Sequence, residues 1–260
     1  MASADEMAPV GALSFLLVLA TASGLAAAEP ALPPPAASGP PACAVPAELM
    51  VVDGKLPHLA ARLHTGGPVK IVAIGGASTA GLAAGSPDLA YPHRLQETLA
   101  RLYPPVAITV LNEGAPRQSA QQMLDRFPRD VFAERPVLVI WETGTTDAVR
   151  GIDTEEFAAT LQSGIEAIEA HGADVILVDP QFSHRTSAVI DFDRYLKALY
   201  RVADVNDLYV FPRYEMMRYW SEQNVFNFDG VAKDGRASFA ARVYECLGYR
   251  LAEAIRTALQ

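Results

Sequence analysis

The stretch KIVAIGGAS, residues 70–78, decides the fold class. Its apolar, β-branched residues predict a short strand, and the glycines that follow predict a sharp turn. Runs of the same kind recur along the chain, and stretches with helical periodicity separate them. The strand runs are apolar throughout, which indicates strands buried on both faces. A parallel sheet covered by helices on both sides satisfies that requirement.

The pattern gives a definite order of elements. The predicted strands span residues 70–76, 106–114, 137–144, 173–180 and 208–213. The predicted helices span residues 91–104, 118–135, 154–172, 188–204, 213–223 and 238–258. Thr154 is predicted as the N-cap of its helix and Gly172 as the residue that ends it. The predicted fold is a three-layer α/β/α sandwich around a five-stranded parallel sheet.

The N-terminal region reads as an export signal. Residues 10–25 are apolar and end in three alanines, Ala26–Ala28, which predicts a secretory signal peptide over residues 1–28. The preceding residues lack Lys and Arg and include Asp5 and Glu6, which is atypical of such signals. An uncleaved anchor is the alternative, although the run is shorter than the roughly 20 residues a span needs. We expect a periplasmic or secreted protein with no stable membrane anchor after cleavage.

Two further features bound the domain. Residues 29–46 are rich in Pro and Ala and predict a linker, which leaves residues 47–260 as the folded domain. Cys43 and Cys246 are the two cysteines of the chain. They are expected to form a disulfide in an oxidising compartment, the alternative being two unrelated buried thiols.

The charge balance restricts the partners. A formal net charge of −9 argues against nucleic acid as a partner, because neutralising phosphates needs a basic surface. The five histidines suggest no metal site, and no cofactor motif is present in the glycine-rich turn, which matches neither a dinucleotide fingerprint nor a phosphate-binding loop. We therefore expect neither a metal nor a cofactor.

Ligands of parallel α/β sheets sit at the carboxyl ends of the strands, so the residues that follow each strand are the candidates. The turn Gly76-Ala77-Ser78 follows the first strand, and Asn112-Glu113-Gly114 follows the second. The third strand is followed by Gly144-Thr145-Thr146-Asp147 and the fourth by Gln181 and His184.

These loops resemble the first three sequence blocks of the SGNH, or GDSL-type, hydrolase family, over roughly residues 67–258. The run TGTTDAVRGID, residues 143–153, looks like an exported bacterial branch of it. The resemblance implies Ser78 as nucleophile and an oxyanion hole made by the N–H groups of Ser78 and Gly114. Thr146 stands where the family has a third donor, an Asn amide.

The last block of the family, Asp-x-x-His, is absent. Asp229 and Asp234 are each followed three residues later by Ala, and no histidine occurs after His184. Three explanations stay open: His184 is the base, Asp229 or Asp234 is a base without histidine, or the site has lost hydrolysis and binds without turnover. Asp147 and Gln181 are expected at the pocket, Asp147 being equally suited to capping a turn.

The leading functional hypothesis is a serine-dependent hydrolase or acyl-transfer enzyme. Its substrates would be carboxylic esters, either O-acylated envelope glycans or small esters. The alternative is a catalytically degenerate protein that holds an acylated glycan in the periplasm. A structural role in an envelope assembly is a third possibility, suggested only by the Pro-rich arm. The oligomeric state, the acyl group and the alcohol are not encoded in any pattern we find.

Overall fold

A computed structural model describes residues 43–260. Its core is one parallel sheet of five strands in the order β2-β1-β3-β4-β5. The strands are β1 (Val69–Gly75), β2 (Ile108–Gly114), β3 (Leu138–Glu142), β4 (Asp174–Val178) and β5 (Val210–Phe211). All four neighbouring pairs are parallel. The predicted fold class is confirmed.

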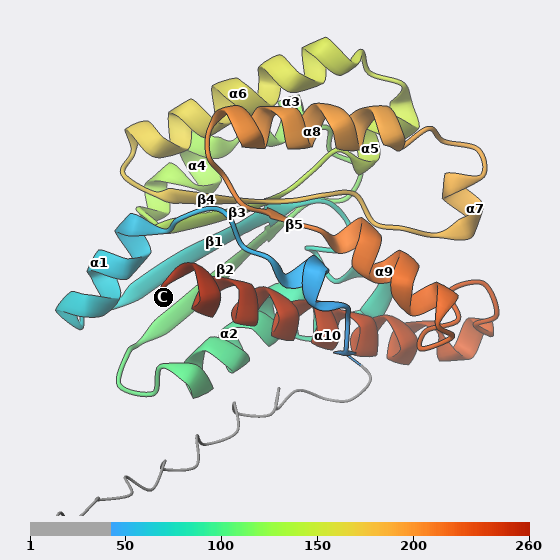
Figure 1. The fold of residues 1–260 in the computed structure, drawn as a ribbon, viewed down its shortest axis with the longest axis horizontal. Helices are drawn as coiled ribbons and strands as arrows, with labels where there is room; N and C mark the ends of the chain where they lie inside the picture. Colours follow the sequence, from blue (N-terminus) through green and yellow to red (C-terminus); the bar gives the residue numbers. More distant parts are fainter. Residues whose placement is uncertain (1–42) are drawn as a thin grey trace, which may run out of the picture. The chain divides into compact units, whose positions relative to one another are not determined.

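Helices cover both faces of the sheet. In Figure 1, α2 and α10 pack together on one face, while α6 and α8 pack together on the other. The α-helices are α1 (Pro57–Thr65), α2 (Tyr91–Leu102), α3 (Ala120–Leu124), α4 (Phe127–Asp130), α5 (Thr145–Arg150), α6 (Thr154–Ala170), α7 (His184–Ser187), α8 (Asp193–Val205), α9 (Arg213–Glu222) and α10 (Arg236–Ala258). All strands therefore present their carboxyl ends at one edge, where α5, α7 and α9 begin.

Two predicted helix details are wrong. The helix expected over residues 118–135 is broken into α3, α4 and a short 3₁₀ turn, Phe132–Glu134. Pro128 cannot donate to the carbonyl four residues earlier, so a continuous helix loses a hydrogen bond there. The N-cap of α6 is Asp153 and not Thr154, because the Asp153 carboxylate accepts hydrogen bonds from the N–H groups of Glu155 and Glu156.

The fifth strand is shorter than predicted. Only Val210 and Phe211 pair with β4. Pro212 follows them and has no N–H for a ladder hydrogen bond, and α9 begins at Arg213. The early end of β5 places the Arg213 side chain at the carboxyl edge of the sheet rather than within a strand.

The predicted disulfide is present. Cys43 and Cys246 are bonded across a sequence separation of 203 residues. Two hydrogen bonds reinforce the attachment: Arg250 Nε donates to the Cys43 carbonyl and Trp220 Nε1 donates to the Ala44 carbonyl. The segment that enters the domain is therefore fixed to α9 and α10. The predicted signal peptide, and residues 29–42 of the predicted linker, lie outside the described residues.

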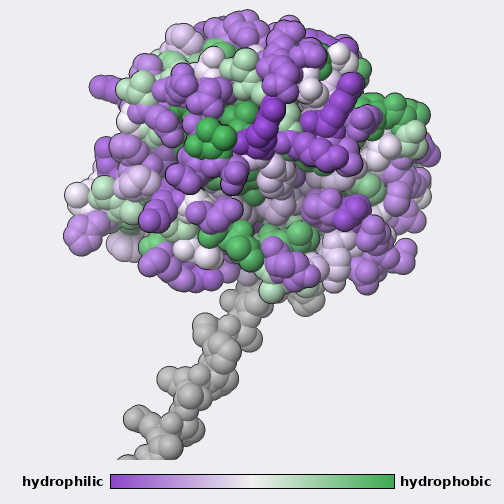
Figure 2. Space-filling view, turned by 45° about the horizontal axis from the view of Figure 1, so that its top comes forward, coloured by the Kyte–Doolittle hydropathy of each residue, from purple (hydrophilic) through white to green (hydrophobic). Residues whose placement is uncertain are grey.

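The face seen in Figure 2 is mostly hydrophilic, with hydrophobic residues in small separate groups. Apolar side chains are concentrated instead around the sheet, where Trp141 is fully buried. Packing there is close: a Cβ added at Gly164 of α6 would lie 2.4 Å from the Trp141 ring. From residue 43 onward, no helix has the length and apolarity to span a bilayer.

Candidate active site at the carboxyl edge of the sheet

The turn after β1 places Ser78 at the carboxyl edge of the sheet. The turn needs glycine: a Cβ at Gly75 would lie 2.1 Å from Thr79 Oγ1 and 2.8 Å from the Glu142 side chain. The chain therefore passes directly against the end of β3. Ser78 itself is only 5% exposed. The predicted nucleophile thus lies in a tight, largely buried turn.

The partner of the Ser78 hydroxyl is an arginine. Arg213 Nη1 donates to Ser78 Oγ at 2.8 Å, and its Nη2 donates to Glu142 Oε1 at 3.0 Å. Its Nε donates to the Asp179 carbonyl at 2.9 Å. Arg213 is 1% exposed and Glu142 is 3% exposed, so this is a buried ion pair. A guanidinium stays protonated in proteins, so it cannot take the serine proton.

Glu142 is held ionised by its neighbours. Its Oε2 accepts hydrogen bonds from the Gly76 N–H at 3.0 Å and from Thr79 Oγ1 at 2.7 Å. Burial is the largest single influence and disfavours the charge. The Arg213 charge and the hydrogen bonds from Thr79 and Gly76 together outweigh it, so the pKa of Glu142 lies below its usual value. Glu142 and Arg213 are therefore both charged and mutually compensated.

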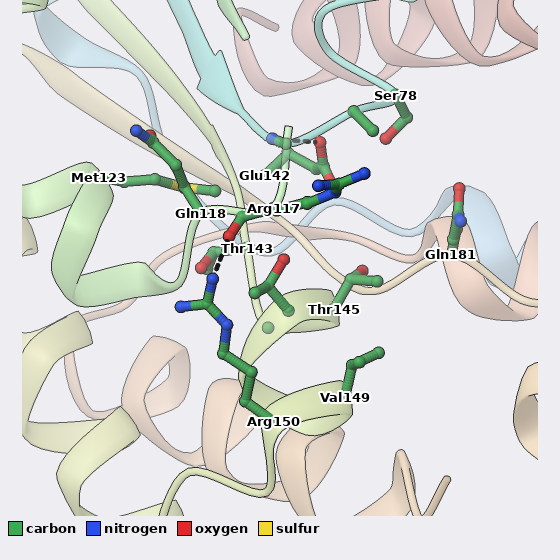
Figure 3. Close-up of a pocket in the computed structure, with 14 residues that line it drawn as sticks. Ser78, Arg117, Gln118, Met123, Glu142, Thr143, Thr145, Val149, Arg150 and Gln181 are labelled. Carbon is green, nitrogen blue, oxygen red and sulfur yellow. Dashed lines mark hydrogen bonds between the residues drawn. The ribbon is translucent and has the colours of Figure 1, made fainter. Parts of the chain in front are cut away.

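A pocket of about 330 Å³ opens above this ion pair. Figure 3 shows its labelled side chains, which come from the end of β3, from the loops that follow the strands, and from α3 and α5. Most of the lining side chains are polar; the full lining is Gly76, Ala77, Ser78, Arg117, Gln118, Met123, Glu142, Thr143, Gly144, Thr145, Thr146, Val149, Arg150 and Gln181.

Two hydroxyls of this pocket have unmet hydrogen-bonding capacity. The Oγ1 atoms of Thr143 and Thr145 are buried and have no hydrogen-bond partner within the described residues. Buried polar atoms are normally paired, so these two hydroxyls are exceptions, and both are closed off from the open space of the pocket.

The expected oxyanion donors are placed unequally. The Ser78 N–H donates to no other group among residues 43–260. The Gly114 N–H donates to Asn112 Oδ1 at 3.0 Å, while Asn112 Nδ2 donates to the Thr79 carbonyl at 2.7 Å. Thr146 lines the pocket. Of the three expected donors, the Ser78 N–H is thus free, the Gly114 N–H is bonded to Asn112 of its own strand, and the Thr146 hydroxyl lies at the pocket wall.

The two predicted pocket residues differ in their positions. Gln181 lines the pocket beside Ser78. Asp147 is 2% exposed, is not among the lining residues, and accepts a hydrogen bond from the Ala120 N–H at the start of α3. Asp147 therefore fixes α3 to the loop after β3, in line with the capping alternative.

The three candidate bases, His184, Asp229 and Asp234, make no hydrogen bond to Ser78 within the described residues. His184 Nε2 forms a hydrogen bond with Ser221 Oγ at 3.1 Å, on the exposed side of α9. Asp229 faces Arg185 at 3.9 Å and is exposed. Asp234 is exposed, in the short 3₁₀ turn Lys233–Gly235. The roles of all three residues as base therefore stay predictions.

Asp179 is a further buried carboxyl of this edge. It follows β4, is fully buried, and accepts hydrogen bonds from the Tyr214 N–H at 2.8 Å and from the Tyr200 hydroxyl at 3.3 Å. Burial raises the pKa of Asp179 to about 7, against the opposing effects of the Tyr214 N–H, the Arg213 charge and the Tyr200 hydroxyl. No cation lies in direct contact with its carboxyl group in the described structure.

Arg213 and Glu142 were not singled out as functional from the sequence. Glu142 is visible there as a charged residue at the end of an all-apolar strand. Arg213 follows a Pro and is the last residue of the fifth predicted strand. An ionisable side chain at a strand's carboxyl end is the signal that could have found both.

A family model matches residues 42–260, and it describes the Non-GDSL lipase-like family. The chain belongs to this family. The match covers the whole described domain, and the family suspected from the loops is thereby supported. A search of the curated proteins finds no match.

Three solved structures with the same fold are, by their titles, a lipase/acylhydrolase and two esterases. A lipase/acylhydrolase from Enterococcus faecalis is 23% identical with a TM-score of 0.61, covering 73% of this chain and 96% of its own. An acetylxylan esterase from Geobacillus stearothermophilus is 19% identical with a TM-score of 0.54, covering 70% and 95%.

A two-domain esterase active on acetylated mannans also aligns. It is 19% identical with a TM-score of 0.63, covering 79% of this chain. This chain spans 55% of that larger protein. At these identities the likeness establishes the shared fold.

Proposed function

We propose that this protein binds an acyl ester of a glycan in the pocket above Ser78 and hydrolyses it slowly through Ser78, without a histidine base. One observation carries the proposal: the Ser78 hydroxyl lies at the carboxyl end of β1, in the pocket, and is held there by Arg213. Because that hydroxyl accepts from Arg213, its own proton is free to point elsewhere.

A hydroxyl-rich ligand suits the rest of the pocket. The Thr146 hydroxyl at the pocket wall can donate to and accept from a sugar hydroxyl. Gln118 and Gln181 add amide groups at the wall. Two of the structural neighbours act on acetylated mannan and acetylated xylan by their titles, which makes an O-acetylated glycan the reasonable first substrate.

The chemistry is nucleophilic acyl transfer. Ser78 Oγ forms a bond to the ester carbonyl carbon and loses its proton to a solvent hydroxide, while the carbonyl electron pair moves onto oxygen. The Ser78 N–H, which donates to no group among residues 43–260, and the Arg213 guanidinium are donors available to that oxyanion. The C–O bond to the sugar then breaks, the sugar oxygen takes a proton from water, and water hydrolyses the acyl-serine.

The absent base sets the expected rate and its dependence on pH. General-base catalysis contributes roughly 10²–10⁴-fold, so turnover is expected to be lower than in an enzyme with a histidine by about that factor. A histidine base gives a rate that levels off above a pKa near 6.5. Without it, the rate depends on hydroxide and continues to rise with pH.

The test is a pH profile of p-nitrophenyl acetate and acetylated xylo-oligosaccharide hydrolysis from pH 6 to 9, together with fluorophosphonate labelling. Ser78→Ala is the matched control for both readouts. Labelling that disappears in this variant, with a rate rising about tenfold per pH unit, supports the proposal. A plateau above pH 7 would instead show a titrating base, and the same profile of His184→Ala would identify it.

Binding without turnover is the second candidate, and a specific observation favours it. The Gly114 N–H is already occupied by Asn112, so an oxyanion would have one donor fewer. Losing one such donor typically costs on the order of a hundredfold in rate. If wild type and Ser78→Ala bind acetylated xylo-oligosaccharide equally by calorimetry and neither labels nor hydrolyses, the protein is a binding module.

The proposed setting is outside the cytoplasm. The Cys43–Cys246 disulfide supports an oxidising compartment. The signal peptide over residues 1–28 remains a prediction. N-terminal sequencing of the exported protein tests it, with a first residue near 29 as the expected result.

A further inference from the structure

The loop between β2 and α3 places an arginine at the pocket that contains Ser78. Arg117 lines this pocket, and Figure 3 shows its side chain extending from the loop toward Ser78. Within residues 43–260 its guanidinium donates no hydrogen bond and takes part in no ion pair. Because a guanidinium is always charged in proteins, Arg117 brings an uncompensated positive charge to the pocket.

The other charges of the pocket do not cancel it. Among the described residues that line the pocket, Glu142 is the one carboxylate, and its charge is compensated by Arg213. The chain as a whole carries a formal net charge of −9, which repels anions in general. A cationic pocket in an acidic protein therefore attracts an anionic group at this one place, where it would otherwise be disfavoured.

The backbone of Arg117 is held in an unfavourable conformation. Its φ is +64°, in the left-handed region that crowds the Cβ of any residue other than glycine. Arg150 of α5 donates from Nη2 to the Arg117 carbonyl at 2.7 Å and from Nη1 to Gln122 Oε1 at 2.9 Å. One arginine of the pocket thus fixes the loop that carries the other. Strain that neighbouring residues maintain at a pocket indicates a functional position.

We propose that Arg117 binds a carboxylate of the sugar, so that the preferred ligand is an O-acylated glycan that contains uronic acid units. This inference rests on the proposed binding of an acylated glycan above Ser78. A uronate carries one negative charge and two coplanar oxygens. Both properties match a single guanidinium, which binds a carboxylate through two parallel hydrogen bonds. The Gln118 amide, which also lines the pocket, can bond a neighbouring sugar hydroxyl.

The test compares an acetylated xylo-oligosaccharide that carries one glucuronic acid branch with the same oligosaccharide without the branch. We expect the wild type to hydrolyse the acidic one with a kcat/KM about fivefold higher, through a lower KM. In Arg117→Gln the ratio of the two kcat/KM values should fall to about one. Raising the ionic strength from about 0.05 M to about 0.5 M should lower the wild-type ratio, because salt screens exposed charges.

Arg135→Gln is the matched control for charge. Arg135 is also exposed, also has a positive φ and lies outside the pocket, so this variant changes the net charge equally and should keep the wild-type ratio. Arg117→Gly separates binding from folding, because glycine adopts a positive φ without strain. We expect this variant to lose the preference for the acidic oligosaccharide at unchanged or higher thermal stability.

The outcomes distinguish this inference from the proposed hydrolysis. Equal kcat/KM values for the two oligosaccharides in the wild type overturn the inference and leave the hydrolysis intact. So does an equal loss of preference in Arg117→Gln and Arg135→Gln, which would show a general charge effect. If the wild type hydrolyses neither oligosaccharide, the hydrolysis fails and calorimetry decides. Tighter binding of the acidic oligosaccharide, abolished in Arg117→Gln, then supports the inference, whereas equal or absent binding overturns it.

Discussion

Two groups of ionisable residues at the same edge of the sheet differ in almost every physical respect. Around Ser78, the Arg213–Glu142 pair is buried, bonded on all sides and charge-compensated. Around α7, His184 and Asp229 are exposed and held by single surface contacts. The residue types that usually perform base catalysis are in the second group, and the hydroxyl that would need them is in the first.

The comparison shows that the residues held most firmly at this edge are those around Ser78, and not those around α7. In the resembled family the serine meets a histidine from the segment before the last helix. Here a guanidinium from α9 occupies the hydrogen-bonding position at Ser78. The segment before α10 carries no histidine and is partly open to solvent. The turn is thus stabilised by a permanent charge, whereas a histidine would provide a titratable one.

The largest expected effect comes from breaking the buried pair. Arg213→Met leaves the Glu142 carboxylate buried and unpaired, so we expect a loss of about 3–5 kcal/mol in the free energy of unfolding. Urea denaturation measures it. Arg201→Met, which breaks an exposed pair with Glu155, should cost less than about 1 kcal/mol. Equal losses in the two variants would mean that the buried ion pair stabilises the fold no more than the exposed ion pair does.

The second effect is a dependence of stability on pH from Asp179. Its folded pKa of about 7 exceeds the unfolded value near 3.9, so the folded state binds more protons between those values. Its contribution to stability is therefore present below about pH 4 and is lost as pH rises to about 7.

The loss is expected to be about 2–4 kcal/mol between pH 4 and pH 7, taking 1.36 kcal/mol per pKa unit. Urea denaturation at pH 5, 6, 7 and 8 measures it against Asp179→Asn, which cannot titrate. The wild type should lose stability relative to this variant as pH rises. Parallel curves for the two proteins would show that Asp179 is already ionised at pH 5.

A smaller effect is expected at Thr79, which links the turn to the ion pair. Thr79→Val keeps the shape but removes the hydrogen bonds to Glu142 Oε2 and to the Tyr91 hydroxyl. The loss should be about 1–3 kcal/mol, because a charged acceptor is involved. Thr65→Val, at an exposed helix end, is the control and should lie within about 0.5 kcal/mol of wild type in the same thermal unfolding assay.

The smallest effect is expected at His184. Because its ring contacts Ser221 on the surface, His184→Ala should change stability by less than about 0.5 kcal/mol. Hydrolysis and labelling should remain within twofold of wild type. A tenfold loss of labelling with intact folding would mean that α7 moves toward Ser78 when substrate binds, and it would restore His184 as the base.

Much of the fold could be predicted from local patterns in the sequence. The run at residues 70–76 and its four counterparts are apolar because both faces are covered, and this signal survives in a single sequence. The helix predicted over residues 118–135 is interrupted near Pro128. The helical spacing of the apolar residues favoured one continuous helix, and the prediction gave too little weight to the hydrogen bond that a proline cannot donate. The N-cap role of Asp153 was not predicted, because capping depends on the orientation of a single side chain.

The site was only half predictable. Ser78 is fixed by its place after the first strand and by the glycines before it, both of which are local. Arg213 reaches Ser78 across 135 positions of sequence, and no local pattern reports such a contact. The occupation of the Gly114 N–H by Asn112 likewise depends on a side-chain orientation that the sequence leaves open.

The disulfide has a mechanical consequence. Tension applied through the chain ahead of Cys43 is transmitted across the covalent bridge to Cys246 and into α10. Residues 44–245 lie in parallel with that bridge and bear little of the load. A pull along the chain would therefore stretch the segments outside the bridge first, and the sheet with its Ser78 turn would keep its geometry while the covalent link holds.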